Sequence, residues 1–542
     1  MNHHQTAKQN ALLAFVIIFS VTLIGIYFRP LMIIDETRYV SVAWEMWDKG
    51  SFLVPLINGE PYHHKPPLLF WLFHLDWFLF GVNETTIRFI PMLFGLGTLA
   101  VLYRLYLALW SDDQEGATYA ILVAAGTVIF AFYNSLIMFD VILTFFVLLG
   151  AYHIIRATQS PSRYNFMMFS VAFGLAVLTK GPVVLVHLLP LMIFACYFTP
   201  HKLSRSFYIK LALAFGGGVL IALAWAVPAG ITGGEEYRHA IFFGQTANRM
   251  VESFAHQRPL WWYLMLLPLL LFPWSLYKPF YSSLKQIVFD APLKILTGWL
   301  LTTLFFFSLI SGKQLHYIMP EIALFSLLFT RVLRTAAPSQ MLSAKLIGYS
   351  FLLYGAALAV FPFIMPMTKA SLTFEQDTAE FLVAVVMIAV NGIYLIRQKF
   401  ISHNHALRSV ALSSVLVVLV THLPVHNFLA KLDLSNFSQQ IAQLQEKGIP
   451  VLHDRKYHDQ YHFIGRLQQP LIVVNNNEEI AHYAQKDPDT VIVTYERQRK
   501  IDWLNQALII EKTDFKGKYA FLIRAKDYQA FYGTPSEEGT QK

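Results

Sequence analysis

Two adjacent carboxylates, Asp35 and Glu36, stand directly after the first long apolar run of the chain, in the stretch IIDETRY. Apolar side chains then recur at helical spacing from Tyr39 to Trp47, which predicts an amphipathic helix lying along a membrane surface. The dipole of such a helix favours carboxylates at its N-terminus. The two acids are therefore either a reaction centre held at the membrane or only the capped end of an interfacial helix, and the residues alone leave both interpretations open.

A lysine follows in the turn-rich stretch NGEPYHHKPP, residues 58–67. The two prolines after Lys65 restrict the backbone there, so its ammonium would be held in one place, where it could bind a phosphate. The alternative is a lysine that reaches up to a lipid headgroup. His63 and His64 beside it are either metal ligands or packed aromatic rings.

Other polar side chains interrupt or border apolar runs. Asp140 lies near the start of one such run, in NSLIMFDVILTFF, and Lys180 lies at the end of another, in LTKGPV. Ionisable groups at such positions are costly and usually face a functional cavity. Further cations and rings occur in neighbouring loops: Arg249 in the loop 231–259, and Lys313 and Tyr317 in SGKQLHYIMPE. Together these groups predict a basic, aromatic, carboxylate-containing cavity that suits a lipid-linked phosphate.

The composition indicates an integral membrane protein. Hydrophobic residues make up 55% of the chain and charged residues 14%, with a mean hydropathy of +0.46, whereas soluble domains carry roughly 25% charge. The net charge of +8 is expected from the bias of basic residues toward cytoplasmic loops. Nucleic-acid binding is not expected, because no basic cluster accompanies a recognition motif. The single cysteine, Cys196, excludes a disulfide within the chain and a zinc site made of thiolates.

Thirteen apolar runs are predicted to span the membrane, and the first is interpreted as an uncleaved signal anchor. They are residues 11–28, 88–110, 117–134, 138–156, 164–180, 182–199, 209–230, 260–277, 294–311, 314–333, 345–366, 378–396 and 407–424. One further apolar run, residues 66–81, opens with two prolines, carries His74 and Asp76, and is short for a span.

The distribution of basic loops decides how the run 66–81 is interpreted. If it does not cross and the N-terminus is cytoplasmic, the loops rich in lysine and arginine lie in the cytoplasm, as the positive-inside rule requires. If it crosses, the same loops lie outside. The run is therefore predicted to be re-entrant or interfacial and buried against protein. This topology places Asp35, Lys65, Asp140 and Lys180 on the outer, periplasmic face.

From about residue 425 the pattern changes to short apolar runs that alternate with polar helical stretches, which is typical of a small α/β domain. It contains no glycine-rich phosphate loop. We therefore predict a transmembrane domain over residues 1–424, with periplasmic juxtamembrane helices at about 30–85 and a periplasmic loop at 231–259. A periplasmic α/β domain is predicted over 425–542.

The motifs occur in an order that resembles a known family. They are DETRY, then EM at 45–46, then FLVPLINGEPYHHKPPLLFW, then Asp140, then GLAVLTKGP. This series is similar to that of the ArnT-like aminoarabinose transferases, which are membrane-embedded glycosyltransferases of the GT-C superfamily, related more distantly to protein O-mannosyltransferases. The expected fold class is accordingly an α-helical polytopic membrane protein of the GT-C type with about thirteen transmembrane helices and a small C-terminal α/β domain.

The resemblance implies a glycosyltransferase of the bacterial inner membrane. Its donor would be an aminoarabinose-like sugar on undecaprenyl phosphate, and its acceptor would lie on the periplasmic side, as lipid A of lipopolysaccharide does. We expect contact with membrane lipids and a monomeric chain. Two alternatives remain: a GT-C transferase that modifies another glycan or a protein, and a transporter or flippase for polyprenyl-linked sugars. Charges gathered on one outer face disfavour the transporter, which needs them near the bilayer midplane.

The resemblance also assigns roles to residues. Asp35 would be the main catalytic carboxylate, favoured over its neighbour Glu36, and Asp140 a second functional carboxylate. Lys65 and Arg249 would bind the donor phosphate. Further residues are expected to bind substrate, either from the resemblance or from their place in the predicted cavity. They are Lys180, Tyr39, Tyr62, Tyr317 and Lys313.

The chain differs from the family at positions whose side chains can bind a zinc ion in other family members. His64 stands where the family has a glutamate before the lysine of the KPP motif, and Gln245 and Thr246 stand where it has a Glu-His pair. Of the family's ligands only Asp140 is kept, and His64 could replace another. The sequence leaves open whether Asp140 and His64 hold a divalent metal ion, and no other cofactor is expected.

Overall fold

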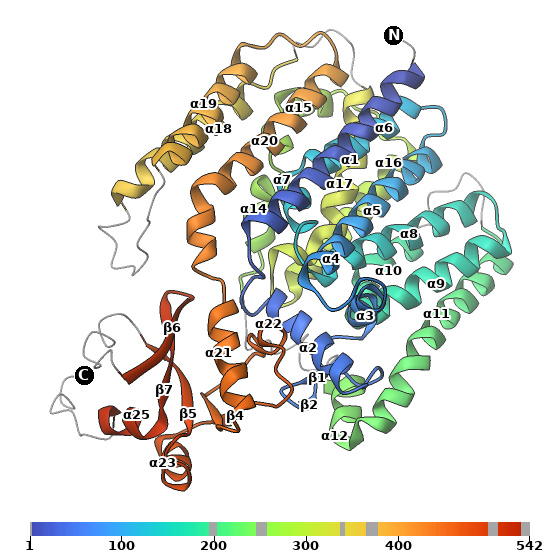
Figure 1. Cartoon of the computed structure of the whole chain (residues 1–542). Helices are drawn as coiled ribbons and strands as arrows, with labels where there is room; N and C mark the ends of the chain where they lie inside the picture. Colours follow the sequence, from blue (N-terminus) through green and yellow to red (C-terminus); the bar gives the residue numbers. More distant parts are fainter. Residues whose placement is uncertain are drawn as a thin grey trace. The chain divides into compact units, whose positions relative to one another are not determined.

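The structure of the protein is a computed structural model (Figure 1). It describes residues 3–194, 203–244, 257–335, 342–364, 378–496 and 508–532. The chain divides into two compact units. The first unit comprises Met1–Tyr27, His63–Ala359 and Thr378–Pro424, and the second comprises Phe28–Tyr62, Val360–Asp377 and Val425–Lys542. The first is helical, and the second contains a sheet. The expected fold class, a helical polytopic membrane protein with a small C-terminal α/β domain, is confirmed in this respect.

Within the described residues, nine helical segments are long and apolar enough to cross a membrane. They are Gln5–Phe28, Glu84–Leu109, Phe139–Gln159, Arg163–Phe194, Arg205–Thr232, Ala291–Leu309, Leu315–Thr335, Ala379–Arg397 and His403–His426. The helices in them are α1 (His3–Phe28), α4 (Glu84–Ile87), α5 (Phe89–Leu109), α8 (Phe139–Gln159), α9 (Arg163–Lys180), α10 (Val184–Phe194), α11 (Arg205–Thr232), α16 (Ala291–Leu309), α17 (Met319–Thr335), α19 (Thr378–Arg397) and α20 (His403–Ala430).

The expected number of thirteen spans is not confirmed. The run predicted at 117–134 forms two shorter helices, α6 (Gln114–Gly126) and α7 (Val128–Tyr133). Two other predicted spans, at 164–180 and 182–199, follow one another as α9 and α10 in one helical segment of 32 residues. The remaining helices of the first unit are α3 (Leu68–Phe80), α12 (Gly234–His239), α14 (Trp262–Leu270), α15 (Lys278–Leu284) and α18 (Lys345–Ile364).

Helix α3 occupies the apolar run whose crossing was in question. It has 13 residues, which gives a length of about 20 Å against roughly 30 Å for the hydrocarbon core. Its polar residue Asp76 is buried and accepts a hydrogen bond from the Thr86 hydroxyl. A short helix with a satisfied buried carboxylate agrees with a segment that does not cross, although its place in the membrane stays a prediction.

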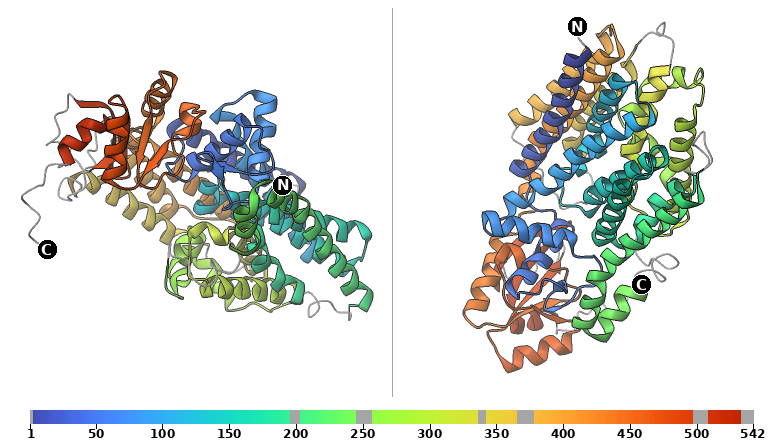
Figure 2. Two further views of the ribbon diagram at one scale, coloured as in Figure 1. Left: turned by 90° about the horizontal axis from the view of Figure 1, so that it is seen from below. Right: turned by 90° about the vertical axis from the view of Figure 1, so that its right-hand side faces the viewer.

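Helices α8, α9 and α11 lie side by side in the first unit (Figures 1 and 2). Glycines allow the closest approach: a Cβ at Gly174 of α9 would lie 2.7 Å from Ile221 Cβ, and one at Gly218 of α11 would lie 2.8 Å from the Ser170 carbonyl oxygen. Close backbone contact of this kind is common between membrane helices, where packing replaces the hydrophobic effect. The packed helices carry Asp140 at the start of α8 and Lys180 at the end of α9.

A five-stranded sheet forms the centre of the C-terminal segment, in the order β4-β3-β5-β7-β6. Strands β4 and β5 run parallel to β3, whereas β7 is antiparallel to β5 and β6 to β7. The strands are β3 (Val451–Asp454), β4 (Ile472–Val474), β5 (Val491–Glu496), β6 (Ile509–Phe515) and β7 (Lys518–Arg524). The helices of this segment are α21 (Ser435–Glu446), α22 (His462–Gly465), α23 (Asn477–Lys486) and α25 (Ala525–Tyr532).

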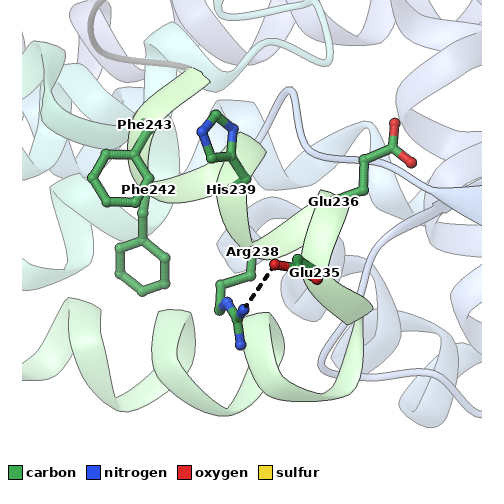
Figure 3. Close-up of a pocket in the computed structure, with 6 residues that line it drawn as sticks. All are labelled: Glu235, Glu236, Arg238, His239, Phe242 and Phe243. Atoms are coloured by element: carbon green, nitrogen blue, oxygen red, sulfur yellow. Dashed lines mark ion pairs between the residues drawn. The ribbon is translucent and has the colours of Figure 1, made fainter.

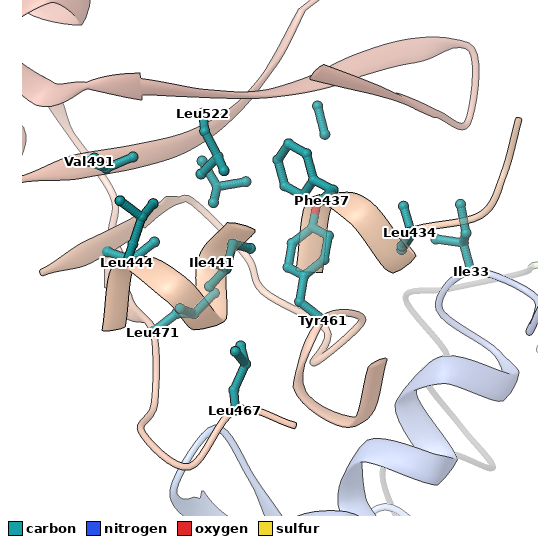
Figure 4. Packing of buried hydrophobic residues seen from close by; sticks show 13 residues of the cluster. Ile33, Leu434, Phe437, Ile441, Leu444, Tyr461, Leu467, Leu471, Val491 and Leu522 are labelled. Carbon is teal, nitrogen blue, oxygen red and sulfur yellow. The ribbon is translucent and has the colours of Figure 1, made fainter. Parts of the chain in front are cut away.

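Alternate residues of the central strands point to opposite faces of this sheet. Val491 and Leu522 pack against Ile441 of α21 on one face (Figure 4). Ile492 and Phe521 pack on the other face, with residues of α23 and α25. The alternation read from the sequence therefore produces a sheet that is covered by helices on both faces.

Helix α2 (Glu36–Asp48) and the hairpin of β1 (Leu56–Ile57) and β2 (Glu60–Pro61) belong to the second unit. The Ser41 hydroxyl accepts a hydrogen bond from the Phe463 N–H at 3.0 Å, and the Trp44 indole donates to the Leu467 carbonyl at 2.9 Å. These contacts group residues 28–62 with the C-terminal segment. The boundary at residue 425 stays a prediction, but the predicted juxtamembrane helix is largely covered by protein.

Removing the Ser41 hydroxyl tests this packing. In Ser41→Ala the buried Phe463 N–H loses its acceptor, which we expect to cost about 1–3 kcal/mol. Hydrogen exchange should become faster at Phe463 and its neighbours, and thermal unfolding in detergent should shift to lower temperature. Ser111→Ala, at an exposed serine of the first unit, serves as the control. Unchanged exchange at Phe463 would contradict the packing described.

Candidate active site

The two adjacent carboxylates have different surroundings. Glu36 is fully buried, and its carboxylate forms an ion pair with Arg29. The Met32 N–H donates a further hydrogen bond to Glu36 Oε2 at 2.9 Å. Asp35 is exposed at the N-terminus of α2 and makes no capping hydrogen bond with its side chain. The charge of Glu36 is thus neutralised by Arg29, and its side chain is fixed in the fold. Asp35 is the carboxylate of the two that a substrate can reach.

The turn that presents Asp35 has an unusual backbone. Ile34 has a φ of 75°, in the left-handed region, where a residue with a branched Cβ is strained by about 1–2 kcal/mol. Its N–H donates to the Thr37 hydroxyl at 2.9 Å, while Ile33 is buried beside Leu434 in the core of the C-terminal segment (Figure 4). The fold therefore holds this turn from both sides, as is common for turns that place a functional group.

Arg38, Tyr39 and Tyr62 form a group next to Asp35 in the second unit. The Arg38 guanidinium lies 5.3 Å from the centroid of the Tyr39 ring. Burial by itself lowers the pKa of Arg38, but the interactions with Tyr62, Tyr39 and Asp35 outweigh it and raise that pKa above its ordinary value. Both tyrosines are buried. Arg38 stays a cation beside the exposed carboxylate and was not among the residues predicted to act.

Asp140 and Lys180 are brought together in the first unit. The buried Asp140 carboxylate forms an ion pair with the Lys180 ammonium. That ammonium also lies 4.1 Å from the centroid of the Tyr317 ring, and His316 Nε2 lies 3.8 Å from Asp140 Oδ2. The group combines a fixed cation, its counter-ion and two aromatic rings. His316 directly precedes Tyr317 in the stretch SGKQLHYIMPE and was given no role of its own.

Lys65 approaches the same end of α8. Its ammonium lies 5.3 Å from the centroid of the Phe139 ring, and Phe139 directly precedes Asp140. The Phe139 ring in turn packs edge-on against Phe70 of α3, with ring centroids 5.7 Å apart. The first unit thus collects the cations Lys65 and Lys180 around the N-terminus of α8. Cations held beside aromatic rings in this way can bind an anionic group.

Lys313 is placed differently from this group. Only 2% of Lys313 is exposed, and its ammonium donates to the Arg258 carbonyl at 3.0 Å. The Tyr263 hydroxyl donates to the neighbouring Gln314 carbonyl at 2.9 Å. Lys313 therefore fastens the C-terminal end of the predicted loop 231–259. Arg249 lies outside the described residues, and its role stays a prediction.

Within the described residues, His64 and Asp140 do not belong to a set of three side chains able to hold a metal ion. His64 is exposed and packs against His63, with ring centroids 4.3 Å apart. Asp140 already has the Lys180 ammonium as its counter-ion, and a divalent cation at the same carboxylate would repel it. Across the described parts of the chain, the set of three side chains able to hold a metal is Glu45, Asp459 and His462. A metal at His64 and Asp140 therefore fits the structure poorly and stays an untested prediction.

A cavity of about 710 Å³ lies elsewhere, beside α12 and the turn Ala240–Gly244 that follows it (Figure 3). It is lined by Glu235, Glu236, Arg238, His239, Phe242 and Phe243. The Arg238 guanidinium lies 3.8 Å from the Glu235 carboxylate. None of the predicted site residues that the structure describes lines this cavity.

The sequence is similar to those of known transferases. Residues 64–231 match the family of dolichyl-phosphate-mannose-protein mannosyltransferases. The undecaprenyl phosphate-alpha-4-amino-4-deoxy-L-arabinose arabinosyl transferase of Pseudomonas aeruginosa is 30% identical over 327 residues, which cover 59% of this chain and 58% of the relative. The enzyme of the same name from Pseudomonas paraeruginosa is 28% identical over 395 residues, 72% of this chain and 70% of the relative. The alignment thus spans less than two thirds of the P. aeruginosa relative.

The fold is also similar to that of a solved transferase. ArnT from Cupriavidus metallidurans bound to undecaprenyl phosphate superposes with a TM-score of 0.70 and 18% sequence identity, over 94% of this chain and 97% of ArnT. Its apo form gives a TM-score of 0.69. In sequence and in fold the chain therefore resembles the ArnT-like transferases, and the resemblance predicted from its motifs is confirmed.

Proposed function

We propose that this chain is a membrane glycosyltransferase that moves an aminoarabinose-like sugar from undecaprenyl phosphate to lipid A. The observation that carries the proposal is the group around the N-terminus of α8, where Lys180 is fixed by Asp140 over the Tyr317 ring and Lys65 lies beside Phe139. Such a group suits a phosphate joined to a sugar. The names of the relatives and the ligand of the C. metallidurans structure support the same donor.

The cations would act on the leaving group. When the bond between the anomeric carbon and the phosphate oxygen breaks, negative charge develops on the polyprenyl phosphate. Lys65, together with Arg249, would neutralise that charge. Lys180 is already oriented by Asp140, so it would need little rearrangement during the reaction. Asp140 would then be a positioning residue for the Lys180 ammonium.

Asp35 would act on the acceptor or on the sugar. The acceptor attacks the anomeric carbon from the face opposite the phosphate, which inverts the configuration. Asp35 is exposed, so it can deprotonate an attacking hydroxyl or stabilise positive charge on the sugar ring. Glu36 is engaged by Arg29 and would keep the turn in place.

The proposed topology follows the charge bias of the loops. The N-terminus and the basic loops would lie in the cytoplasm of a bacterial cell, and the transferase groups and the C-terminal domain would lie on the periplasmic side of the inner membrane.

The competing functions are modification of another glycan or of a protein, and transport of the lipid-linked sugar. Mass spectrometry of lipid A and surface glycans from a strain lacking the gene, with and without the restored gene, distinguishes them. Unchanged lipid A would overturn the proposed acceptor.

The first prediction concerns the ion pair. Lys180→Ala and Asp140→Asn should each lower transfer by about 10²-fold or more, because each removes the oriented ammonium from the developing phosphate charge. The double variant should be little worse than either single one, since the two residues act as a unit. Transfer is measured in membranes supplied with donor. Lys285→Ala, at an exposed lysine, is the control, and multiplicative losses in the double variant would contradict the coupling.

The second prediction separates the adjacent carboxylates. Asp35→Asn should abolish transfer to a hydroxyl while leaving thermal stability unchanged, because Asp35 is exposed. Glu36→Gln should instead destabilise the protein by about 3–5 kcal/mol, because it leaves the buried Arg29 without its counter-ion. Both quantities are measured on the same detergent preparations. The exposed Asp112→Asn is the control, and full activity of Asp35→Asn and Lys65→Ala would refute the assignment.

The third prediction depends on the acceptor. A phosphate of lipid A is already ionised near neutral pH and needs little help from a base, whereas a hydroxyl does. Asp35→Asn should therefore weaken transfer to a phosphate much less than transfer to a hydroxyl. The comparison uses lipid A that carries its phosphates and lipid A from which they have been removed. Equal losses with both acceptors would argue for a role of Asp35 at the sugar ring.

A further inference from the structure

A second cluster of ionisable side chains is buried in the second unit, apart from the residues discussed above. Glu45 comes from α2, Asp459 from the turn before α22, and His462 from the first residue of α22. Their exposed fractions are 5%, 0% and 1%. One ligand atom of each residue lies within 4.8 Å of one from each of the other two.

The cluster holds two carboxylates beside one histidine. Within the described part of the chain, no lysine or arginine forms an ion pair with Glu45 or Asp459; their ion-pair partner is His462. His462 Nδ1 lies 3.2 Å from Asp459 Oδ1, yet that buried oxygen accepts no hydrogen bond. Buried charges in proteins are normally paired or bound to a metal ion. The two carboxylates therefore need either one more cation or a proton to compensate their charge.

The surrounding groups orient these side chains. The Asn58 N–H donates to Glu45 Oε1 at 2.6 Å and to Asp459 Oδ2 at 3.2 Å, and the Gly59 N–H donates to Glu45 Oε2 at 2.8 Å. Both donors lie in the turn between β1 and β2, where positive φ angles of 51° and 83° suit the Asn-Gly pair and aim the two N–H groups inward. The Tyr457 hydroxyl lies 2.8 Å from His462 Nδ1.

We propose that Glu45, Asp459 and His462 bind a divalent transition-metal ion of the Zn²⁺ class. Carboxylate oxygens and an imidazole nitrogen are ligands that such ions accept, and partners that hydrogen-bond to the ligands are typical of metal sites. In a tetrahedral Zn²⁺ site the ligand atoms lie about 3.4 Å apart. A small inward movement of the three side chains would supply three of the four ligands. Asp459 Oδ1, which accepts no hydrogen bond, is the atom that such an ion would engage.

The ion would have a structural role near the proposed catalytic carboxylate. It would join the C-terminal half of α2 to α22, while Asp35 stands at the N-terminus of the same α2. The three ligands are buried, and a water molecule would fill the fourth position of a tetrahedral site. The competing account is a proton shared between the two carboxylates, in which case the cluster holds no metal.

Metal analysis tests the proposal on the whole protein, purified in detergent without chelators. The wild type should carry about one more Zn²⁺ per chain than each of Glu45→Gln, Asp459→Asn and His462→Ala. Glu478→Gln and His482→Ala, at exposed positions of α23, should keep the ion. Equal metal contents in the wild type and the three cluster variants, including no metal in any of them, would overturn the proposal. So would an ion that is lost in His64→Ala and kept in the cluster variants.

A second measurement is decided by the wild-type protein alone. Chelator-treated wild type should unfold at a lower temperature than untreated protein, and added Zn²⁺ should restore the difference, because an ion that binds only the folded state stabilises it. The same cycle should leave the unfolding temperature of Glu45→Gln unchanged. An unfolding temperature of the wild type that responds to neither chelator nor Zn²⁺ would favour the shared proton and overturn the metal site.

Discussion

A charge that leaves water must find a partner, because its desolvation costs several kcal/mol, and this constraint determines which acidic groups of the chain can do chemistry. Glu36 is fully buried and is neutralised by Arg29. Asp140 is buried and is neutralised by Lys180. Each of these carboxylates is therefore held in an ion pair with a cation. Asp35, directly beside Glu36, does not need such a partner, because the turn at Ile34 leaves it exposed to solvent.

The same constraint links the juxtamembrane helix to the C-terminal segment. Helix α2 carries an exposed acid at its start and a buried one, Glu45, near its end. The N–H groups of Asn58 and Gly59 and the side chain of His462 surround Glu45. Asp35 is therefore attached to a helix that is fixed along its length by polar contacts. The α/β segment supports helix α2, which explains why the helix and the segment belong to the same compact unit.

The sequence predicted the helical membrane-type fold, the alternating strands of the C-terminal segment and an apolar run at 66–81 too short for an ordinary span. Each of these depends on local periodicity and length. It did not predict contacts between distant residues. The Ser41 hydroxyl meets the Phe463 N–H across 422 residues, and no local pattern encodes such a contact. Likewise Asp140 and Lys180 were each identified as unusual, but their pairing over 40 residues depends on how α8 and α9 pack. The number of spans was least predictable, because apolar runs that break into short helices have the same composition as spans.

The division of labour between the two candidate carboxylates follows from their partners. A carboxylate that accepts a proton loses its charge, and if Asp140 did so, Lys180 would be left as an uncompensated buried cation. Proton transfer to Asp140 would thus destroy the arrangement that holds the Lys180 ammonium over the Tyr317 ring. Asp35 carries no such cost, since it is exposed and solvent can compensate a change in its charge. Physical chemistry therefore favours Asp35 for a step that moves a proton and Asp140 for a step in which charge must stay in place.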